Sequence, residues 1–153
     1  MHALEHKIPP PLVATACALL MWGIAQYSPI LVLAAPMRWG VVLLVLLTGA
    51  AFCVAGVWSF RQAHTTVNPL KPDTASRLVR TGVYRYSRNP MYVGFALLLL
   101  AWACYLAAPW ALLGVLAFVL YIQRFQIAPE ERALAQIFGD DFQRYRAQVR
   151  RWL

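Results

Sequence analysis

Charged side chains are scarce in this sequence. Of its 153 residues, 13% are charged and 61% are hydrophobic, and the mean hydropathy is +0.55. Soluble domains carry roughly a quarter charged residues, so an ordinary soluble domain is excluded. We expect a polytopic membrane protein that forms one domain over residues 1–153. A secretory signal peptide is not expected, because Met1–Lys7 is short and no small-residue cleavage pattern follows it.

Metal-binding patterns are also lacking. The three cysteines, Cys17, Cys53 and Cys104, lie in different apolar runs without a CxxC pair, and the three histidines are scattered. Such cysteines are typical of packing positions inside helices. We therefore expect no metal site.

Acidic residues are few, six against 14 lysines and arginines, which gives a formal net charge of +8. A basic chain can indicate nucleic-acid binding. Here, however, the basic residues flank the apolar runs, which points to anionic lipid headgroups and membrane topology instead. We therefore predict membrane lipids as partners and no nucleic acid.

Four long apolar runs predict an all-α membrane helix bundle. The expected membrane helices cover about residues 9–27, 39–60, 90–106 and 110–126. The short proline-bounded run Ile30–Pro36 is either an interfacial connector between the first two or an extension of one of them, and Ala107-Ala108-Pro109 makes the last two a hairpin. Small residues in the second run, including Gly49 and Cys53, favour close helix packing, either within the bundle or between subunits. The tail, residues 127–153, predicts a cytoplasmic amphipathic helix broken at Gly139.

The arginines and lysines predict the orientation. Most of them lie in the loop 61–89 and in the tail 127–153, whereas the opposite side carries only Arg38. The positive-inside rule then places both termini in the cytoplasm. The loop and the tail would meet on that face and form a site there.

The stretch Thr81–Gly94 joins this basic loop to the third apolar run. Asn89 suits a helix N-cap and Pro90 suits the first helical position. A helix N-terminus beside Arg85 and Arg88 favours an anionic ligand. A plain membrane-entry cap with interfacial tyrosines explains the same residues equally well on physical grounds.

A second polar cluster, Pro129-Glu130-Glu131-Arg132, follows the fourth run. Glutamate is favoured in the first turn of a helix, which accounts for one of the two carboxylates. Two glutamates close to the arginine-rich start of the third helix also suggest ion pairs or a binding site.

Taken together, these motifs resemble the isoprenylcysteine carboxyl methyltransferase and phospholipid methyltransferase family. The resemblance covers about residue 76 to the C-terminus. It rests on Gly82-x-Tyr84, Arg88-Asn89-Pro90-x-Tyr92-x-Gly94, Glu130-Glu131 and Phe138-Gly139-x-x-Phe142-x-x-Tyr145, in that order around a tight hairpin. No GxG occurs in the chain, so a Rossmann-type methyltransferase is excluded.

The resemblance implies an integral membrane methyltransferase that uses S-adenosylmethionine and a lipophilic or prenylated acceptor. By this resemblance, the cofactor-binding residues are Ser76, Arg77, Leu78, Val79, Tyr84, Arg88, Asn89, Pro90, Met91, Tyr92 and Glu130. The candidate catalytic residues are Glu131, as a base for an amine acceptor, and Arg124, as a contact to the substrate.

One departure from the family pattern concerns Asn89, which stands where many members have histidine. Asparagine does not titrate, so no proton transfer is expected at this position. The acceptor stays open among carboxylates, amines and small isoprenoids. A nicotinamide-dependent reductase of a sterol or enone, with a similar C-terminal hairpin, and a non-catalytic membrane scaffold are the alternatives.

Overall fold

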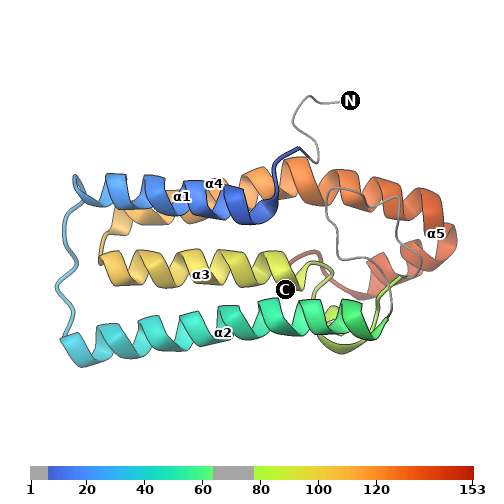
Figure 1. The fold of residues 1–153 in the computed structure, drawn as a ribbon, viewed down its shortest axis with the longest axis horizontal. Coiled ribbons are helices and arrows are strands. Elements are labelled where there is room, and N and C mark those ends of the chain that lie inside the picture. Colours follow the sequence, from blue (N-terminus) through green and yellow to red (C-terminus); the bar gives the residue numbers. More distant parts are fainter. Residues whose placement is uncertain (1–6, 64–77) are drawn as a thin grey trace.

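The structure, a computed structural model, describes residues 7–63 and 78–153 (Figure 1). These residues form helices, and no strand occurs among them. In chain order the elements are α1 (Pro10–Ala25), α2 (Ala35–Gln62), the 3₁₀ turn η2 (Gly82–Arg85), α3 (Pro90–Leu106), the 3₁₀ turn η3 (Pro109–Ala111), α4 (Leu112–Ile122), the π-helical turn η4 (Gln123–Ile127) and α5 (Ala128–Gln148). The all-α prediction is confirmed for this part of the chain.

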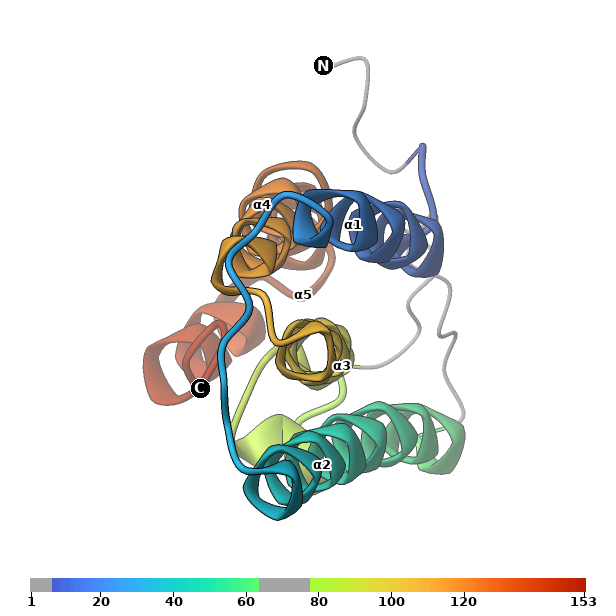
Figure 2. The ribbon, with the colours of Figure 1, turned by 90° about the vertical axis from the view of Figure 1, so that its left-hand side faces the viewer.

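Helix α3 lies at the centre of the bundle. Viewed end-on, α2 packs on one side of it, and the pair α1 and α4 packs on the other (Figure 2). Buried side chains such as Met21, Leu99 and Phe118 fill the core between α1, α3 and α4. Beyond the bundle, η4 and α5 extend past the start of α3 (Figure 1).

The contact between α2 and α3 depends on small residues. A Cβ added at Gly49 would lie 3.0 Å from the carbonyl oxygen of Gly94, and one added at Gly94 would lie 2.4 Å from the Sγ of Cys53. The two backbones approach closely because neither glycine carries a side chain. The small-residue face of α2 therefore packs within the bundle.

The helix bounds differ from the sequence prediction by more than two residues in two places. Helix α2 begins at Ala35, four residues earlier than predicted, because Pro36 lies in its first turn, where the missing N–H is not needed. The fourth helix does not end at residue 126 but continues through η4 into α5. The i→i+5 bonding of the π turn changes the hydrogen-bond register just before Pro129, which accommodates that proline. The bounds predicted for α3 match the structure.

The predicted break in the tail is present at Gly139. Its φ of 46° and ψ of −121° interrupt α5, and a positive φ is a backbone conformation that glycine adopts without strain. The chain turns there, and Phe142 and Tyr145 are buried on the far side of the break.

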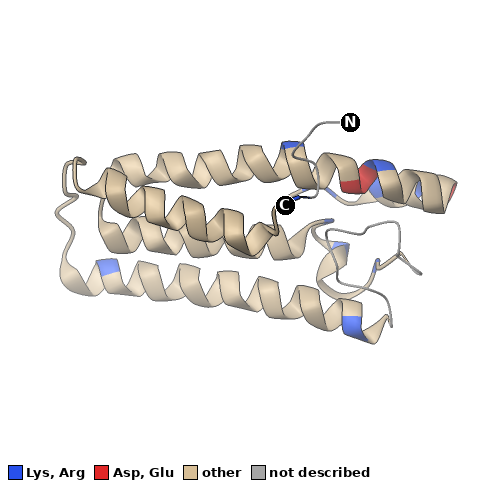
Figure 3. Ribbon diagram, turned by 45° about the horizontal axis from the view of Figure 1, so that its top comes forward, with Lys and Arg blue, Asp and Glu red and all other residues tan. Residues whose placement is uncertain are grey.

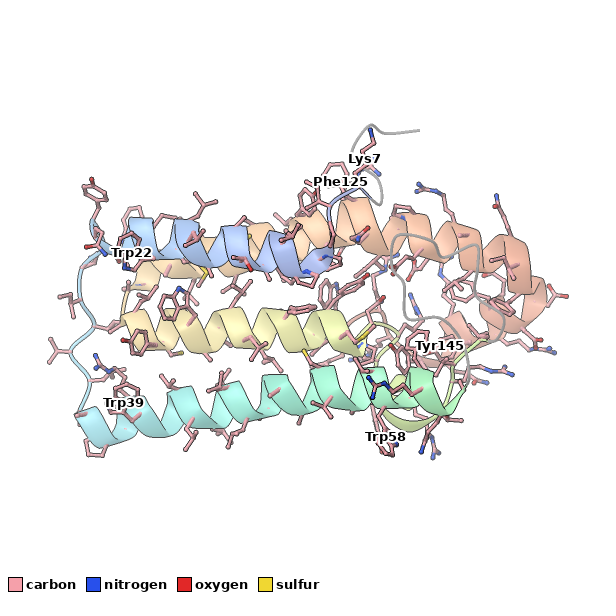
Figure 4. The ribbon with its side chains drawn as sticks, viewed as in Figure 1. Lys7, Trp22, Trp39, Trp58, Phe125 and Tyr145 are labelled. Carbon is pink, nitrogen blue, oxygen red and sulfur yellow. The ribbon has the colours of Figure 1, made fainter. Side chains whose placement is uncertain are left out.

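The outer surface of the bundle suits a lipid environment. Leu44, Val54 and Trp58 on α2 are each more than 60% exposed, which a water-facing surface seldom tolerates over a whole helix. Trp22 and Trp39 lie at one end of the bundle and Trp58 lies toward the other, as interfacial aromatic residues do (Figure 4). Charged residues concentrate at the α5 end, with a basic position near the start of α2, where Arg38 lies (Figure 3).

Within residues 7–63 and 78–153, two helical runs, Ala35–Gln62 and Pro109–Gln148, are long and apolar enough to cross a membrane. The apolar helices Pro10–Ala25 and Pro90–Leu106 are shorter. At 1.5 Å per residue they reach roughly 25 Å, slightly less than the ~30 Å hydrocarbon core of a bilayer. The predicted count of four spans stays a prediction.

Candidate functional site

The loop that leads into α3 is fixed by Gly82. Its φ is +62°, and a Cβ there would lie 2.7 Å from the Oγ of Ser59, so glycine fits both the conformation and the space. The turn η2 then buries Tyr84, whose ring lies edge-on to Phe60 with 5.3 Å between centroids. The hydroxyl of Tyr145 donates to the Tyr84 carbonyl at 2.7 Å. Burial, and after it the neighbouring Tyr145 and Glu130, raise the pKa of Tyr84, which therefore stays neutral.

The start of α3 has the predicted position but a different capping arrangement. Pro90 is the first helical residue and is buried. Asn89 occupies the N-cap, yet its side chain makes no capping hydrogen bond. Its Nδ2 instead donates to the carbonyl of Arg151 at 2.9 Å. Arg151 belongs to the last segment of the chain, Val149–Trp152, called the C-terminal strap below.

Tyr92 and Glu130 form the central pair of the site. Both were predicted from the resemblance, and the structure brings them together from α3 and α5. The Tyr92 hydroxyl donates to Oε1 of Glu130 at 2.7 Å. Burial raises the pKa of Glu130 to about 8; the hydrogen bond from Tyr92 lowers it in part, and the charge of Glu131 adds to the increase. Glu130 is thus a desolvated carboxyl group, and no arginine or lysine of the described residues is paired with it.

Glu131, the next residue, has two positive partners. Its Oε1 accepts from Nη2 of Arg88 at 2.7 Å, and its Oε2 accepts from Nη2 of Arg151 at 2.6 Å. Burial raises the pKa of Glu131, but the hydrogen bonds and charges of Arg151 and Arg88 outweigh that effect, so the pKa is lowered overall. A carboxylate held ionised in this way is suited to holding the arginines in place. The geometry gives no support to its predicted use as a base.

The C-terminal strap lies across the start of α3, and the C-terminus is close to the beginning of that helix in Figure 1. The backbone N–H of Arg88 donates to the carbonyl of Arg150 at 2.9 Å, and Arg88 Nη1 donates to the carbonyl of Val149. Trp152 packs against the bundle core, and its Nε1 donates to Oε1 of Gln123 in η4 at 3.2 Å.

The remaining predicted residues differ in their surroundings. Val79 is buried and Leu78 is half-buried, whereas Ser76 and Arg77 lie outside the described residues. Met91 faces α2, because a Cβ on Gly56 would meet its Cγ at 2.5 Å. Arg124 is exposed on η4, with its guanidinium 5.9 Å from the centroid of the Phe125 ring.

Residue-by-residue reasoning missed three contributors. Tyr145 is part of the motif but carries no predicted role, Arg151 is one of the basic residues of the tail, and no role is predicted for Trp152. The spacing Phe142-x-x-Tyr145 was the available signal for a buried face of the tail. No local pattern distinguishes Arg151 from the exposed Arg150 beside it.

Comparisons with known proteins agree with this architecture. Over 63 residues the chain is 51% identical to an uncharacterised protein of Haemophilus influenzae; the match spans 41% of this chain and 100% of that protein. A family model described as phospholipid methyltransferase matches residues 36–141, which include all of α2 but its first residue, α3, α4 and both members of the Tyr92–Glu130 pair. With its apolar helices and this match over more than half of its length, the chain belongs to the phospholipid methyltransferase family.

Proposed function

We propose that this methyltransferase-family protein uses S-adenosylmethionine to methylate a lipophilic acceptor at a membrane surface. The acceptor class is an isoprenylcysteine-type carboxylate or a related isoprenoid or lipid. The observation that carries the proposal is the Tyr92–Glu130 pair at the start of α3, inside the family-matched range.

The residues of the site fit such a cofactor. Its amine is a cation, and Glu130 is a partly buried carboxyl whose pKa is raised mainly by burial, so a cation bound beside it would favour its ionised form. Tyr84 and Tyr92, both buried beside this carboxyl, are aromatic residues of the kind that can pack against an adenine or a sulfonium. The first turn of α3 adds the positive end of a helix dipole, which suits the cofactor's carboxylate. When bound, the cofactor supplies an electrophilic methyl group.

The protein's part in the reaction is mainly to bind and orient. Methyl transfer is an in-line displacement, so fixing the direction of approach and excluding water contribute most. Glu131 is committed to Arg88 and Arg151, which favours an acceptor that reacts without losing a proton. A carboxylate meets that requirement. Arg124, on the exposed side of η4, keeps its proposed role as a contact to the acceptor.

The topology proposed for this activity has four membrane spans and both termini in the cytoplasm. The loop 61–89 and the tail 127–153 then form the cofactor site on the cytoplasmic face of one domain, and membrane lipids surround α1 to α4. The exposed leucines of α2 and the concentration of charge at the α5 end support this arrangement.

The test is titration calorimetry of the detergent-purified protein with S-adenosylhomocysteine. We expect micromolar binding to the unchanged protein and a loss of about tenfold or more in Glu130→Ala, because a charged hydrogen bond contributes about 1.5–3 kcal/mol. Exposed Asp140→Ala, elsewhere on α5, is the matched control and should bind normally. Binding of NADPH in place of S-adenosylhomocysteine would instead favour the reductase alternative.

A further inference from the structure

The C-terminal strap makes side-chain hydrogen bonds at both ends of the π-helical turn η4. Trp152 bonds Gln123 at the beginning of that turn, and Arg151 bonds Glu131 just beyond its end. Between these two attachments the chain carries Glu130. The segment that makes both attachments is distant in sequence and lies beyond the family-matched range 36–141.

Arg151 makes the more specific of the two attachments. Its Nε and Nη2 donate to the two oxygens of Glu131 at 3.1 and 2.6 Å, a two-pronged pairing that arginine geometry favours. The carbonyl of Arg151 also accepts from Asn89 at the start of α3. One residue thus connects α3, α5 and the strap.

Arg88 completes this arrangement. Its side chain is 9% exposed, and it donates to Glu131 and to the carbonyls of Arg146 and Val149. These bonds use three of the five N–H donors of the guanidinium, and Nε is buried without a partner among the described residues. Arg88 therefore holds the strap in place, and its predicted contact to the cofactor stays a prediction.

We propose that Arg151 is a positioning residue of the methyl-transfer site: through Glu131 and Asn89 it locks the strap across the start of α3 and thereby fixes Glu130 against Tyr92. The role rests on the proposed function, because its consequence is the affinity for the cofactor. Arg151 itself does not touch the cofactor.

The experiment compares Arg151→Gln with Arg150→Gln. Both substitutions remove one arginine charge, and the two positions are adjacent. The Arg150 side chain, however, is exposed, and Arg150 contacts Arg88 through its backbone carbonyl, which the substitution keeps. We expect Arg151→Gln to weaken S-adenosylhomocysteine binding about tenfold, the effect of one lost charged hydrogen bond, and Arg150→Gln to leave it unchanged. Arg151→Lys should recover part of the affinity, since lysine keeps the charge but not the two-pronged geometry.

Hydrogen exchange gives a second readout that does not need the cofactor. The amide of Arg88 donates to the carbonyl of Arg150, so its exchange should accelerate in Arg151→Gln and stay slow in Arg150→Gln. Should Arg151→Gln fail to fold, Trp152→Phe tests the other attachment, because it removes the bond to Gln123 and keeps an aromatic ring. We expect it to weaken binding severalfold.

The outcomes separate the two proposals. Equal affinities of folded Arg151→Gln and the unchanged protein would overturn the role of Arg151 and leave the proposed function standing. The unchanged protein could also fail to bind S-adenosylhomocysteine, while exchange at Arg88 is still faster in Arg151→Gln. That result would overturn the proposed function and with it the positioning role. Tenfold weaker binding with faster exchange, both absent from Arg150→Gln, would establish the positioning role.

Discussion

Glu130 and Glu131 are adjacent residues whose carboxyl groups have opposite surroundings. Glu131 accepts hydrogen bonds from two arginines, and its pKa is lowered in spite of burial. Glu130 accepts from a neutral tyrosine, and burial raises its pKa to about 8. Such a divided pair is typical of binding and catalytic sites, where one carboxylate is structural and the other awaits a partner.

If Glu130 pairs with the cofactor's amine as proposed, its raised pKa predicts a pH dependence of cofactor binding. Below pH 8 most Glu130 is protonated and cannot pair with the ligand's cationic amine. Because the ionised fraction falls about tenfold per pH unit, the Kd for S-adenosylhomocysteine should rise about tenfold from pH 7 to pH 6 and level off above pH 8. Calorimetric titrations across this range measure the slope.

Glu130→Gln is the control for this prediction. It keeps a hydrogen-bonding side chain but cannot ionise, so its binding should be weak and nearly independent of pH between 6 and 8. The same slope in this variant as in the unchanged protein would assign the pH dependence to another group.

At this scale, the sequence identified the residue types of the site better than their contacts. The motifs selected Tyr92 and Glu130, which the structure brings to 2.7 Å. They also selected Arg88 and Asn89, whose partners prove to be Glu131 and the strap. Those partners are far away in the chain, and no local spacing encodes such a contact.

Among the elements, the contact between α2 and α3 has the tightest packing requirement. Gly94 faces α2 with its missing Cβ 2.4 Å from the Sγ of Cys53 and 2.8 Å from the carbonyl oxygen of Gly49. Helix α3 begins with the candidate site, so a shift of α3 to make room for a side chain would also displace Tyr92.

Gly94→Ala should therefore destabilise the protein by about 1–3 kcal/mol, the usual effect of overpacking a close contact. Gly23→Ala in α1 is the matched control, since nothing lies within 4 Å of its added Cβ. Alanine is also the better helix former, so this control should be neutral or stabilising by about 0.5–1 kcal/mol. Thermal unfolding in detergent measures both variants, and equal melting temperatures would contradict the packing described for α2 and α3.

The elements also show which bounds a sequence can predict. Helix α3 has a proline at its first position and a turn with positive φ at Ala107, and both ends were predicted. The end of the fourth helix was not predicted correctly, because Pro129 and the charged residues after it have the sequence pattern of a helix break. A π-helical turn has no sequence signature of its own, yet it carries the helix past that proline.

For the whole molecule, the main feature is the difference between its two ends. Trp22, Trp39 and the connector before α2 lie at one end, and the site lies toward the other (Figure 4). The connector is tied to the turn between α3 and η3, where the N–H of Leu31 donates to the carbonyl of Ala107. If all four helices cross the membrane, these two turns share the side opposite the site.

This arrangement predicts the accessibility of single cysteines in a variant lacking the three native ones. Tyr27, 93% exposed after α1, and the exposed Gln148 at the end of α5 are suitable positions. In intact cells, a membrane-impermeant maleimide should label Tyr27→Cys and should reach Gln148→Cys only after permeabilisation. Labelling of both positions in intact cells, or of neither, would place the two ends on one side and contradict the four-span topology. The positive-inside rule supports the expected result, because Arg38 stands alone at one end while the arginines of the tail lie at the other.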